Sequence, residues 1–524
     1  MVLAAAIGGE ALSDAFTVTG TTIFLGATVI VLIVFLVLCI GGGGGGGLGP
    51  ESPPVAPGKR CLSGHLKIMT ASNTPWVVLD RMGKELGDVM SLKLGHWTIM
   101  VNTFAAIKDA AENFIKELGS RPTNFTADLL NENGRDISLG AYSHDWLLLR
   151  EMGIKNLREF TANKKLEEVV HSVLTKLAED LDKKENRPVN VKEIMVPAVA
   201  GILSHLCFGF DADPSVHDRV ANLMGGGLYK YIVGPRLPVD IMPCLRHFPS
   251  SGLSEAKATV SELNGLLRSE MQRHEKTLSA DKTRDLMDGI IKCRNYAKES
   301  EPEKYKFLTD THVYQVVSNY LGGTTAGFLV SSLTSVALLV SNPDKQEKFA
   351  AEITGVVGED RMPGLDDRET LVYIPAAIEE ILRIACIAPI SVPHKTTQDV
   401  TFRGYKIPAN TATFCNFYGL HFNEEYWPEP CAFKPERFID ENGKFRSDEH
   451  MFAFGYGARS CLAQAEARQM IYLILSWLTH RYVLCRVPGQ ENLDLLQQDP
   501  NVKVAKAVSP FNLVLKRRFG VELS

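Results

Sequence analysis

A single cysteine, Cys461, stands in a loop directly before an apolar segment, 464–478, that is expected to form a helix. The N-terminus of a helix carries the positive end of the helix dipole and backbone N–H groups without partners. Both favour a thiolate over a thiol, and a thiolate is a strong ligand for iron. The position of Cys461 therefore predicts a metal-binding thiolate. A buried structural cysteine in a turn is the alternative.

The residues around the cysteine suit a flat partner that carries carboxylates. Gly455 and Gly457 allow the backbone to turn tightly and to approach such a partner closely. Phe454 can pack beside it, and Arg459 presents a planar fork of donors to a carboxylate. Together with Cys461, these residues predict a haem whose iron takes a cysteine thiolate as its axial ligand.

The whole loop resembles the haem-binding signature of the cytochrome P450 family, Phe-x-x-Gly-x-Arg-x-Cys-x-Gly. In this sequence it reads Phe454-Gly455-Tyr456-Gly457-Ala458-Arg459-Ser460-Cys461-Leu462-Ala463. Ala463 stands where glycine is usual, and alanine is the mildest replacement for glycine on a helix. The resemblance implies haem b (iron protoporphyrin IX) held by the Cys461 thiolate. It also implies electrons from NADPH, delivered by NADPH-cytochrome P450 reductase.

Two further places in the chain would position the edge of such a haem. A helix is expected over 145–161, where Trp146 and Arg150 lie at i, i+4 and so share one face. Taken alone, the pair fits a half-buried aromatic beside a surface arginine. In the P450 family, a Trp-x-x-x-Arg pair donates to a haem propionate. His394 stands where members of the family often offer Arg or His to a propionate, and a surface histidine is the alternative.

A long helix is expected over 310–341, ending at Asn342-Pro343, and its interior contains three glycines in Leu321-Gly322-Gly323-Thr324-Thr325-Ala326-Gly327. Glycine costs a helix interior roughly 1 kcal/mol relative to alanine, so these glycines indicate a groove or a close approach. In the P450 family, this helix crosses the distal face of the haem and carries an acid followed by an alcohol.

The usual acid is missing from this helix. Counting back from Pro343 places Ala326 and Gly327 at the acid and alcohol positions, while counting from Gly322-Gly323 places Thr325 and Ala326 there. Thr324 and Thr325 are the hydroxyls that the helix keeps, and they are the catalytic candidates. A side-chain hydroxyl, an ordered water or a hydroxyl of the substrate would deliver the proton instead.

Glu380 and Arg383 lie one turn apart in a helix expected over 372–384, and Pro435-Glu436-Arg437-Phe438 follows later. A Glu–Arg pair with a second arginine, Arg437, forms a buried network whose charges compensate one another. The P450 family has this triad in the same order before the cysteine loop, and the resemblance covers nearly the whole chain. It implies a mainly α-helical haem-thiolate fold with small β-sheets.

Composition excludes some classes of protein. The 524 residues carry 56 Lys+Arg against 61 Asp+Glu, a balance that gives no sign of nucleic-acid binding. The ten cysteines form no CxxC pairs, which argues against a disulfide framework or a zinc site and fits a reducing compartment. Residues 23–40 are an uncharged apolar run of 18 residues, long enough to span a bilayer as a helix.

We therefore expect three regions: a membrane anchor at 1–40 with its helix at about 18–40, a Gly/Pro-rich hinge at 41–60, and a catalytic domain at 61–524. No Lys or Arg precedes Lys59, so the positive-inside rule places the body in the cytosol. This predicts a single-pass protein of the endoplasmic reticulum membrane. A cleaved signal peptide is the alternative, but it would begin with a basic region.

Within the family, the chain is similar to the animal microsomal group that includes steroid 17-hydroxylases, through Ser120-Arg121-Pro122 and Asp136-Ile137-Ser138-Leu139-Gly140. The glycine-rich helix most resembles the Ile-Gly-Gly-His-Ser-Ala-Val-Gly type of the Spook/Spookier enzymes. These are Halloween-group members of ecdysteroid (moulting hormone) synthesis, and they also lack the acid. The resemblance implies a membrane-anchored monooxygenase acting on a hydrophobic sterol or steroid. An oxygen-independent isomerase or dehydratase and a catalytically silent haem-binding protein stay open as alternatives.

Overall fold

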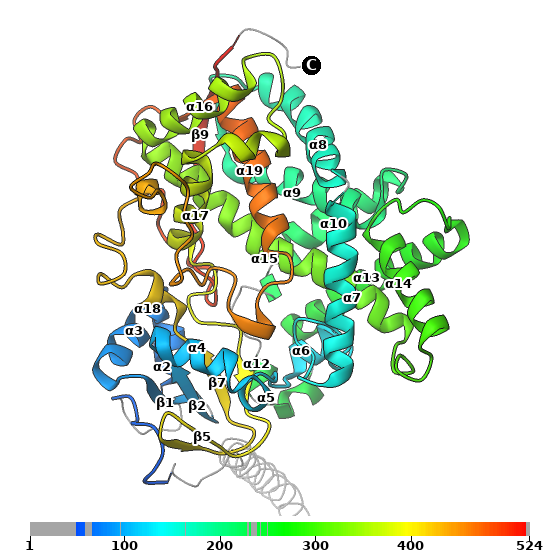
Figure 1. The fold of residues 1–524 in the computed structure, drawn as a ribbon, viewed down its shortest axis with the longest axis vertical. Helices are drawn as coiled ribbons and strands as arrows, with labels where there is room; N and C mark the ends of the chain where they lie inside the picture. The colour runs from blue at the N-terminus through cyan, green and yellow to red at the C-terminus, as the bar shows by residue number, and fades with distance from the viewer. Residues whose placement is uncertain are drawn as a thin grey trace, which may run out of the picture.

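The structure is a computed structural model that describes residues 49–57, 65–94, 96–162, 164–227, 230–231, 238–241, 243–248 and 250–519. The predicted membrane anchor at 1–40 and the glycine tract of the predicted hinge lie outside these residues. Within them the chain is mostly helical, with three small sheets (Figure 1). The expected fold class is confirmed for this part of the chain.

Several helices begin at residues whose side chains cap them. Thr103, Asn124, Ser143, Ser250 and Asp285 each accept a hydrogen bond from a backbone N–H in the first turn of the helix that follows. The α-helices are α2 (Leu66–Ala71), α3 (Pro75–Leu86), α4 (Phe104–Glu112), α5 (Ile115–Leu118), α6 (Phe125–Leu130), α7 (His144–Thr161), α8 (Lys165–Asp182), α9 (Val191–Phe208), α10 (Pro214–Gly225), α12 (Pro238–Ile241), α13 (Ser251–Thr277), α14 (Leu286–Ser300), α15 (Asp310–Ser341), α16 (Pro343–Val357), α17 (Tyr373–Ala385), α18 (Phe417–His421) and α19 (Gln464–Arg481). The short 3-10 helices are η1 (Pro243–His247), η2 (Leu365–Thr370), η3 (Pro435–Phe438) and η4 (Gly457–Arg459).

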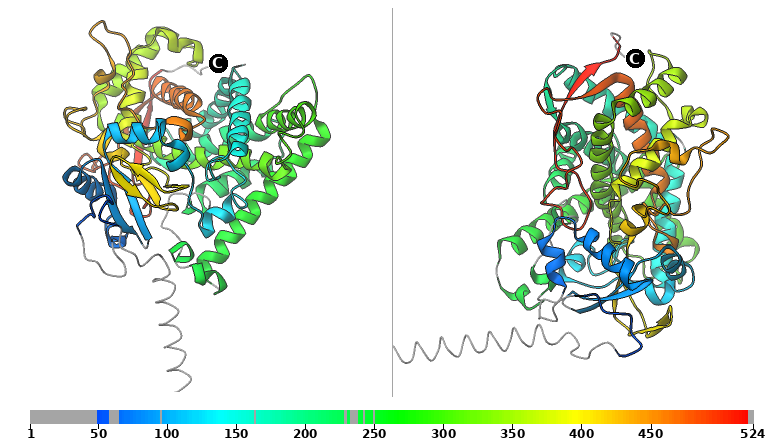
Figure 2. Two further views of the ribbon diagram at one scale, coloured as in Figure 1. Left: turned by 60° about the horizontal axis from the view of Figure 1, so that its bottom comes forward. Right: turned by 90° about the vertical axis from the view of Figure 1, so that its left-hand side faces the viewer.

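A four-stranded sheet pairs two strands from the first fifth of the chain with two strands that lie shortly before the cysteine loop. Its order is β1-β2-β7-β4, with β2 antiparallel to β1 and parallel to β7. In Figure 1 and in the right-hand view of Figure 2, its blue and yellow strands lie together in the lower part of the molecule, beneath the main body of helices. The strands are β1 (Val89–Leu94), β2 (His96–Val101), β3 (Pro188–Asn190), β4 (His394–Lys395), β5 (Val400–Phe402), β6 (Tyr405–Ile407), β7 (Ala412–Cys415), β8 (Tyr482–Arg486) and β9 (Asn512–Arg517).

The long helix α15 runs through the middle of the molecule (Figure 1). It is apolar on all sides, as expected for a helix surrounded by protein. Within the described part of the chain, α9 and α15 are long and apolar enough to cross a membrane, but 67% and 82% of their most apolar windows are buried. Both are therefore core helices. The bounds of α15 match those expected from the sequence.

The predicted charge network of Glu380, Arg383 and Arg437 is confirmed. Glu380 and Arg383 are fully buried on α17 and form two hydrogen bonds of 2.7 and 2.9 Å. Arg437, from η3, donates to the same carboxylate at 3.2 Å. Arg383 also donates to the backbone carbonyls of His421 and Pro430, at 2.6 and 2.7 Å. Every charge in the network has a partner, and the network ties α17 to the segment that precedes the cysteine loop.

Candidate functional site

The loop that carries Cys461 is built from tight turns. Gly455 and Gly457 have φ values of 72° and 68°, which side chains of L residues rarely adopt. A Cβ on Gly457 would also lie 2.8 Å from the carbonyl oxygen of Ala111. The backbone N–H of Cys461 donates to the carbonyl of Phe454 at 2.8 Å. The conformation of the loop therefore requires the two glycines, as the sequence indicated.

The Cys461 thiol is exposed on one side and surrounded by protein elsewhere. Burial raises the pKa of the thiol by more than the backbone N–H of Ala463 and the positive charge of Arg150 lower it. The backbone N–H at the start of α19 therefore acts in the expected direction, but in the protein alone burial outweighs it. A metal ion bound to the sulfur would supply the missing stabilisation, because a coordinating thiol is deprotonated outright.

Two of the expected arginines lie beside this loop. Arg459 stacks on the indole of Trp146, with its guanidinium carbon 3.7 Å from the ring centre. It also donates to the carbonyls of Gly119 and Gly140, each at 2.8 Å. Arg150 donates to the carbonyl of Ser460 at 2.6 Å. Arg150 thus contacts the cysteine loop, whereas the Trp146 indole N–H donates to the carbonyl of Ile137 at 2.9 Å. Donation by this pair to a haem propionate stays a prediction.

A third arginine, Arg121, completes what we call the arginine cluster: Arg121, Arg150 and Arg459. Arg121 is buried and donates to the backbone carbonyls of Ser138, Val392 and Pro393, at 2.9 to 3.0 Å. Arg121 could not be identified as a site residue from spacing, because its partners lie far from it along the chain. Only its place in a motif shared with relatives could have drawn attention to it.

The arginine cluster holds more positive charge than the surrounding protein compensates. Burial, together with repulsion among the arginines, lowers the pKa of Arg459 to about 9 and that of Arg121 to about 10. Among the described residues, buried Asp136 is the carboxylate whose charge acts on both. Burial also raises the pKa of Asp136, so the three guanidinium groups share at most one carboxylate. The excess positive charge suits the two propionates of a haem. The residues present thus fit haem b, with Cys461 as the iron ligand.

His394 and Phe454 lie at the same site. Burial and the charges of Arg121 and Arg459 hold the pKa of His394 well below its usual range, so its ring is neutral at pH 7. Strand β4 places this ring beside the arginine cluster, as predicted, and its contact with a propionate stays a prediction. The half-buried ring of Phe454 lies under the guanidinium of Arg468, 4.6 Å away.

The two catalytic candidates on α15 face different ways. Thr325 is fully buried, and its hydroxyl donates to the carbonyl of Leu321 at 2.6 Å, within its own helix. Thr324 is half-buried. Gly323 and Gly327 are one turn apart, and a Cβ on either would meet nothing within 4 Å. These two glycines form what we call the open face of α15. Thr325 lies about 200° around the helix from Gly323, so it does not reach that face.

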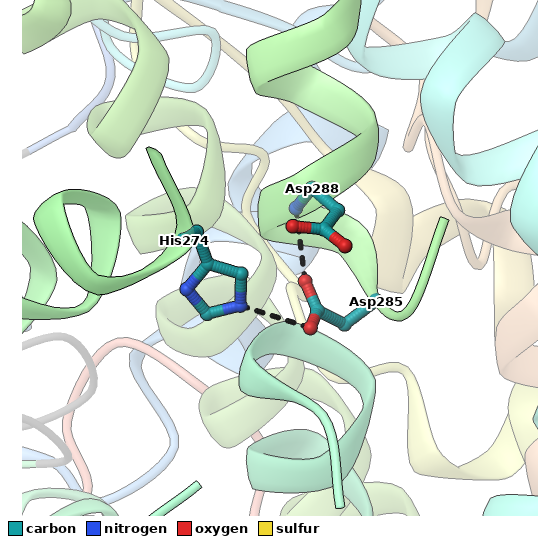
Figure 3. Close-up of side chains that lie close together, drawn as sticks. All are labelled: His274, Asp285 and Asp288. Carbon is teal, nitrogen blue, oxygen red and sulfur yellow. Dashed lines mark hydrogen bonds and ion pairs between the residues drawn. The ribbon is translucent and has the colours of Figure 1, made fainter. Parts of the chain in front are cut away.

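A second group of potential metal ligands, His274, Asp285 and Asp288, lies buried at the junction of α13 and α14 (Figure 3). Their ligand atoms all lie within 4.8 Å of one another. His274 uses both ring nitrogens, 2.6 Å from the carbonyl of Glu270 and 2.9 Å from Asp285. Asp288 accepts two hydrogen bonds of 2.8 Å from the Arg284 guanidinium. Because these donors and acceptors are already satisfied, the group is an ion-pair network and not a metal site.

Comparison with known proteins shows which protein family this chain matches. The family model described as Cytochrome P450 matches residues 53–514. The steroid 17-alpha-hydroxylase/17,20 lyase of Felis catus is 28% identical over 480 residues, which are 90% of this chain and 92% of that protein. The corresponding protein of Squalus acanthias is 27% identical over 436 residues, which are 82% of this chain and 85% of that protein.

Among solved structures, one titled "Zebra fish cytochrome P450 another structure with Progesterone" superposes with a TM-score of 0.73. It is 24% identical and covers 84% of this chain and 99% of its own. This likeness supports the fold.

Proposed function

The chain belongs to the cytochrome P450 family and is a monooxygenase-type oxidoreductase, and from this we propose that it oxidises a sterol or steroid with O2 and electrons from NADPH. The observation that carries the proposal is that the exposed Cys461 thiol lies beside the arginine cluster, whose positive charge the protein does not fully compensate. Relatives aligned along most of the chain bear the name steroid 17-alpha-hydroxylase/17,20 lyase, which supports a steroid as the substrate class.

Each part of the site has a separate task. Haem bound through a thiolate supplies the activation of molecular oxygen. Cys461 would hold the iron, while Arg121, Arg150 and Arg459 would hold the propionates and fix the orientation of the ring. The open face of α15, at Gly323 and Gly327, leaves room for a flat substrate because no side chain projects from it.

Protons for oxygen reduction must come from a group other than the usual acid. Both registers considered for the sequence lie within the continuous helix α15, and neither places a carboxylate at the acid position. Thr324 is the hydroxyl nearer the open face, while Thr325 is engaged with Leu321. We propose that a hydroxyl of the substrate, assisted by Thr324, delivers the proton.

The finer assignment is also a proposal. The glycine-rich sequence of α15 resembles that of the Spook/Spookier enzymes, so we propose a sterol precursor of an ecdysteroid as the substrate. We further propose a single-pass anchor at 1–40 in the endoplasmic reticulum membrane, a hinge at 41–60 and a catalytic domain at 61–524. NADPH-cytochrome P450 reductase is the proposed electron donor.

Turnover of candidate sterols by membranes containing the protein and a reductase tests this proposal. Product should form only when both NADPH and O2 are present. Full product formation without oxygen and NADPH would contradict it and support an isomerase or dehydratase. Absence of product from every sterol, with haem bound and reducible, would support a catalytically silent haem-binding protein.

A further inference from the structure

The loop at 136–140 carries carbonyls that hold two members of the arginine cluster, Arg121 and Arg459, and Trp146. The carbonyl of Ile137 accepts from the Trp146 indole at 2.9 Å and from Arg459 at 3.4 Å. The carbonyl of Ser138 accepts from Arg121 at 3.0 Å, and that of Gly140 accepts from Arg459 at 2.8 Å. The direction of these carbonyls therefore sets the positions of two arginines and the tryptophan.

The N–H groups of the same loop are held from the other side. The side-chain oxygen of Asn319, on α15, accepts from the backbone N–H of Ile137 at 2.8 Å and of Ser138 at 3.0 Å. Its amide nitrogen donates to Asp136 at 3.0 Å. Asp136, which is 2% exposed, in turn accepts from the N–H of Leu139 at 3.0 Å.

A trans peptide unit is rigid, and its N–H and C=O point in opposite directions. Holding the N–H of Ser138 on Asn319 therefore turns the carbonyl of Ile137 toward Trp146 and Arg459. Holding the N–H of Leu139 on Asp136 turns the carbonyl of Ser138 toward Arg121. The side chains of Asn319 and Asp136 form no hydrogen bond with the arginines. They nevertheless fix the peptide planes whose carbonyls accept hydrogen bonds from Arg121 and Arg459.

We propose that Asn319 and Asp136 are positioning residues that lock the 136–140 loop and, through it, Arg121 and Arg459 of the arginine cluster onto the distal helix α15. Asn319 lies one turn before Gly323, next to the open face of α15. The lock therefore joins the surface that would receive the substrate to the groups that would hold the haem propionates. This inference rests on haem binding by a P450-family protein and does not depend on which substrate is oxidised.

This arrangement also predicts that the carboxylate at 136 and the amide at 319 can be swapped. A carboxylate at 319 would still accept the two loop N–H groups, and an amide at 136 would still accept from Leu139 while donating back to 319. Asn319→Asp instead places two carboxylates against each other. Asp136→Asn places its NH2 group against either the Asn319 amide nitrogen or the Leu139 N–H, both of which are donors. The double variant Asp136→Asn/Asn319→Asp keeps the net charge of the protein and restores the pairing.

Transfer of haem from the purified full-length holoenzyme to an apomyoglobin acceptor provides the measurement. Asn319→Leu, Asn319→Asp and Asp136→Asn should each speed haem loss by about tenfold, as substitutions of residues that orient metal-site ligands do. The double variant should return to within about twofold of the parent. Hydrogen exchange of the amides at 137–139 should rise in the single variants and fall again in the double variant. Asn222→Leu, an exposed position on α10, serves as the matched control.

Two results would overturn the proposal. One is Asn319→Leu losing haem no faster than Asn222→Leu. The other is a double variant that loses haem as fast as the faster of the two single variants. If Asn319→Leu yields too little holoenzyme, the comparison of Asn319→Asp with the double variant decides the question. Neither measurement uses turnover, so failure of the sterol proposal would leave this test unaffected.

Discussion

At the scale of single residues, Cys461 is the group on which the haem assignment depends. Cys461→Ser should abolish the long-wavelength band of the carbon monoxide complex of the reduced protein, because that band requires a thiolate ligand. Cys431→Ser, which alters another exposed cysteine, is the matched control and should keep the band. A variant that lacks the Cys461 thiol and still shows the band would refute the assignment.

The two threonines of α15 should differ in their effect on coupling. Thr324→Val should divert electrons from product to peroxide by roughly tenfold or more, because a hydroxyl near the open face is lost. Thr325→Val should leave coupling nearly unchanged, since that hydroxyl bonds to Leu321 within its own helix. The measurement is the ratio of product to NADPH consumed with a hydroxylated sterol. Equal losses in the two variants would contradict the placement of the hydroxyls.

Sequence alone placed the residues that stand in contiguous motifs. Cys461, Arg459 and the pair Trp146 and Arg150 follow from short spacings on one loop and one helix face. Asp136 and Asn319 could not be found in this way, because a buried hydrogen bond between a loop and a helix leaves no periodic trace in either segment. The same reason hid the contribution of Arg121, whose partners are all backbone carbonyls.

At the scale of elements, the network between α17 and η3 should be structural. Glu380→Ala leaves Arg383 buried without its carboxylate, which should cost roughly 3–5 kcal/mol of folding free energy. We expect expression of this variant to give little folded, haem-containing protein. Absorption spectroscopy and size-exclusion chromatography provide the measurement. Glu369→Ala, at an exposed position in η2, is the control. A normally folded, haem-replete Glu380→Ala protein with only slower turnover would contradict this prediction.

The junction of α13 and α14 should make stability depend on pH. Burial alone lowers the pKa of His274, but the hydrogen bond and charge of Asp285 more than offset this, and the net pKa is raised. A histidine whose pKa is raised on folding contributes stability that is complete below its unfolded pKa, near 6.5, and lost as pH rises through the folded value.

His274→Gln should therefore lower the melting temperature more at pH 6 than at pH 9. The melting temperatures of parent and variant across this range provide the measurement, with His144→Gln at an exposed position as the control. A gap between parent and His274→Gln that is constant with pH would show that the imidazolium is not the stabilising form.

Helices were predicted best where the pattern was long and ended at a clear stop. The bounds of α15 were anticipated because Asn342-Pro343 marks its end. The pattern over 104–118 predicts one helix, but the structure has two, α4 and α5. Asn113 ends the first, because its side chain bonds to Asp109 and it propagates a helix poorly. The spacing of the apolar residues does not reveal such a break, because it continues across Asn113.

At the scale of the whole molecule, the orientation relative to the membrane has a direct chemical test. Asn124-Phe125-Thr126 is a glycosylation sequon, and in the folded chain Asn124 caps α6 by accepting from the N–H of Ala127 at 2.8 Å. Glycans are added only in the lumen, so a cytosolic body leaves this sequon unused. We expect no mobility shift on endoglycosidase treatment of microsomes that contain the protein.

A positive control makes this result interpretable. Replacing residues 1–60 with a cleaved signal peptide should send the body into the lumen and produce a shift that Asn124→Gln removes. If the altered chain is glycosylated at Asn124 and the natural chain is not, the sequon is accessible to the transferase and the natural body faces the cytosol, where a reductase can reach it. A glycan on Asn124 of the natural chain would reverse the topology, and with it the proposed source of electrons.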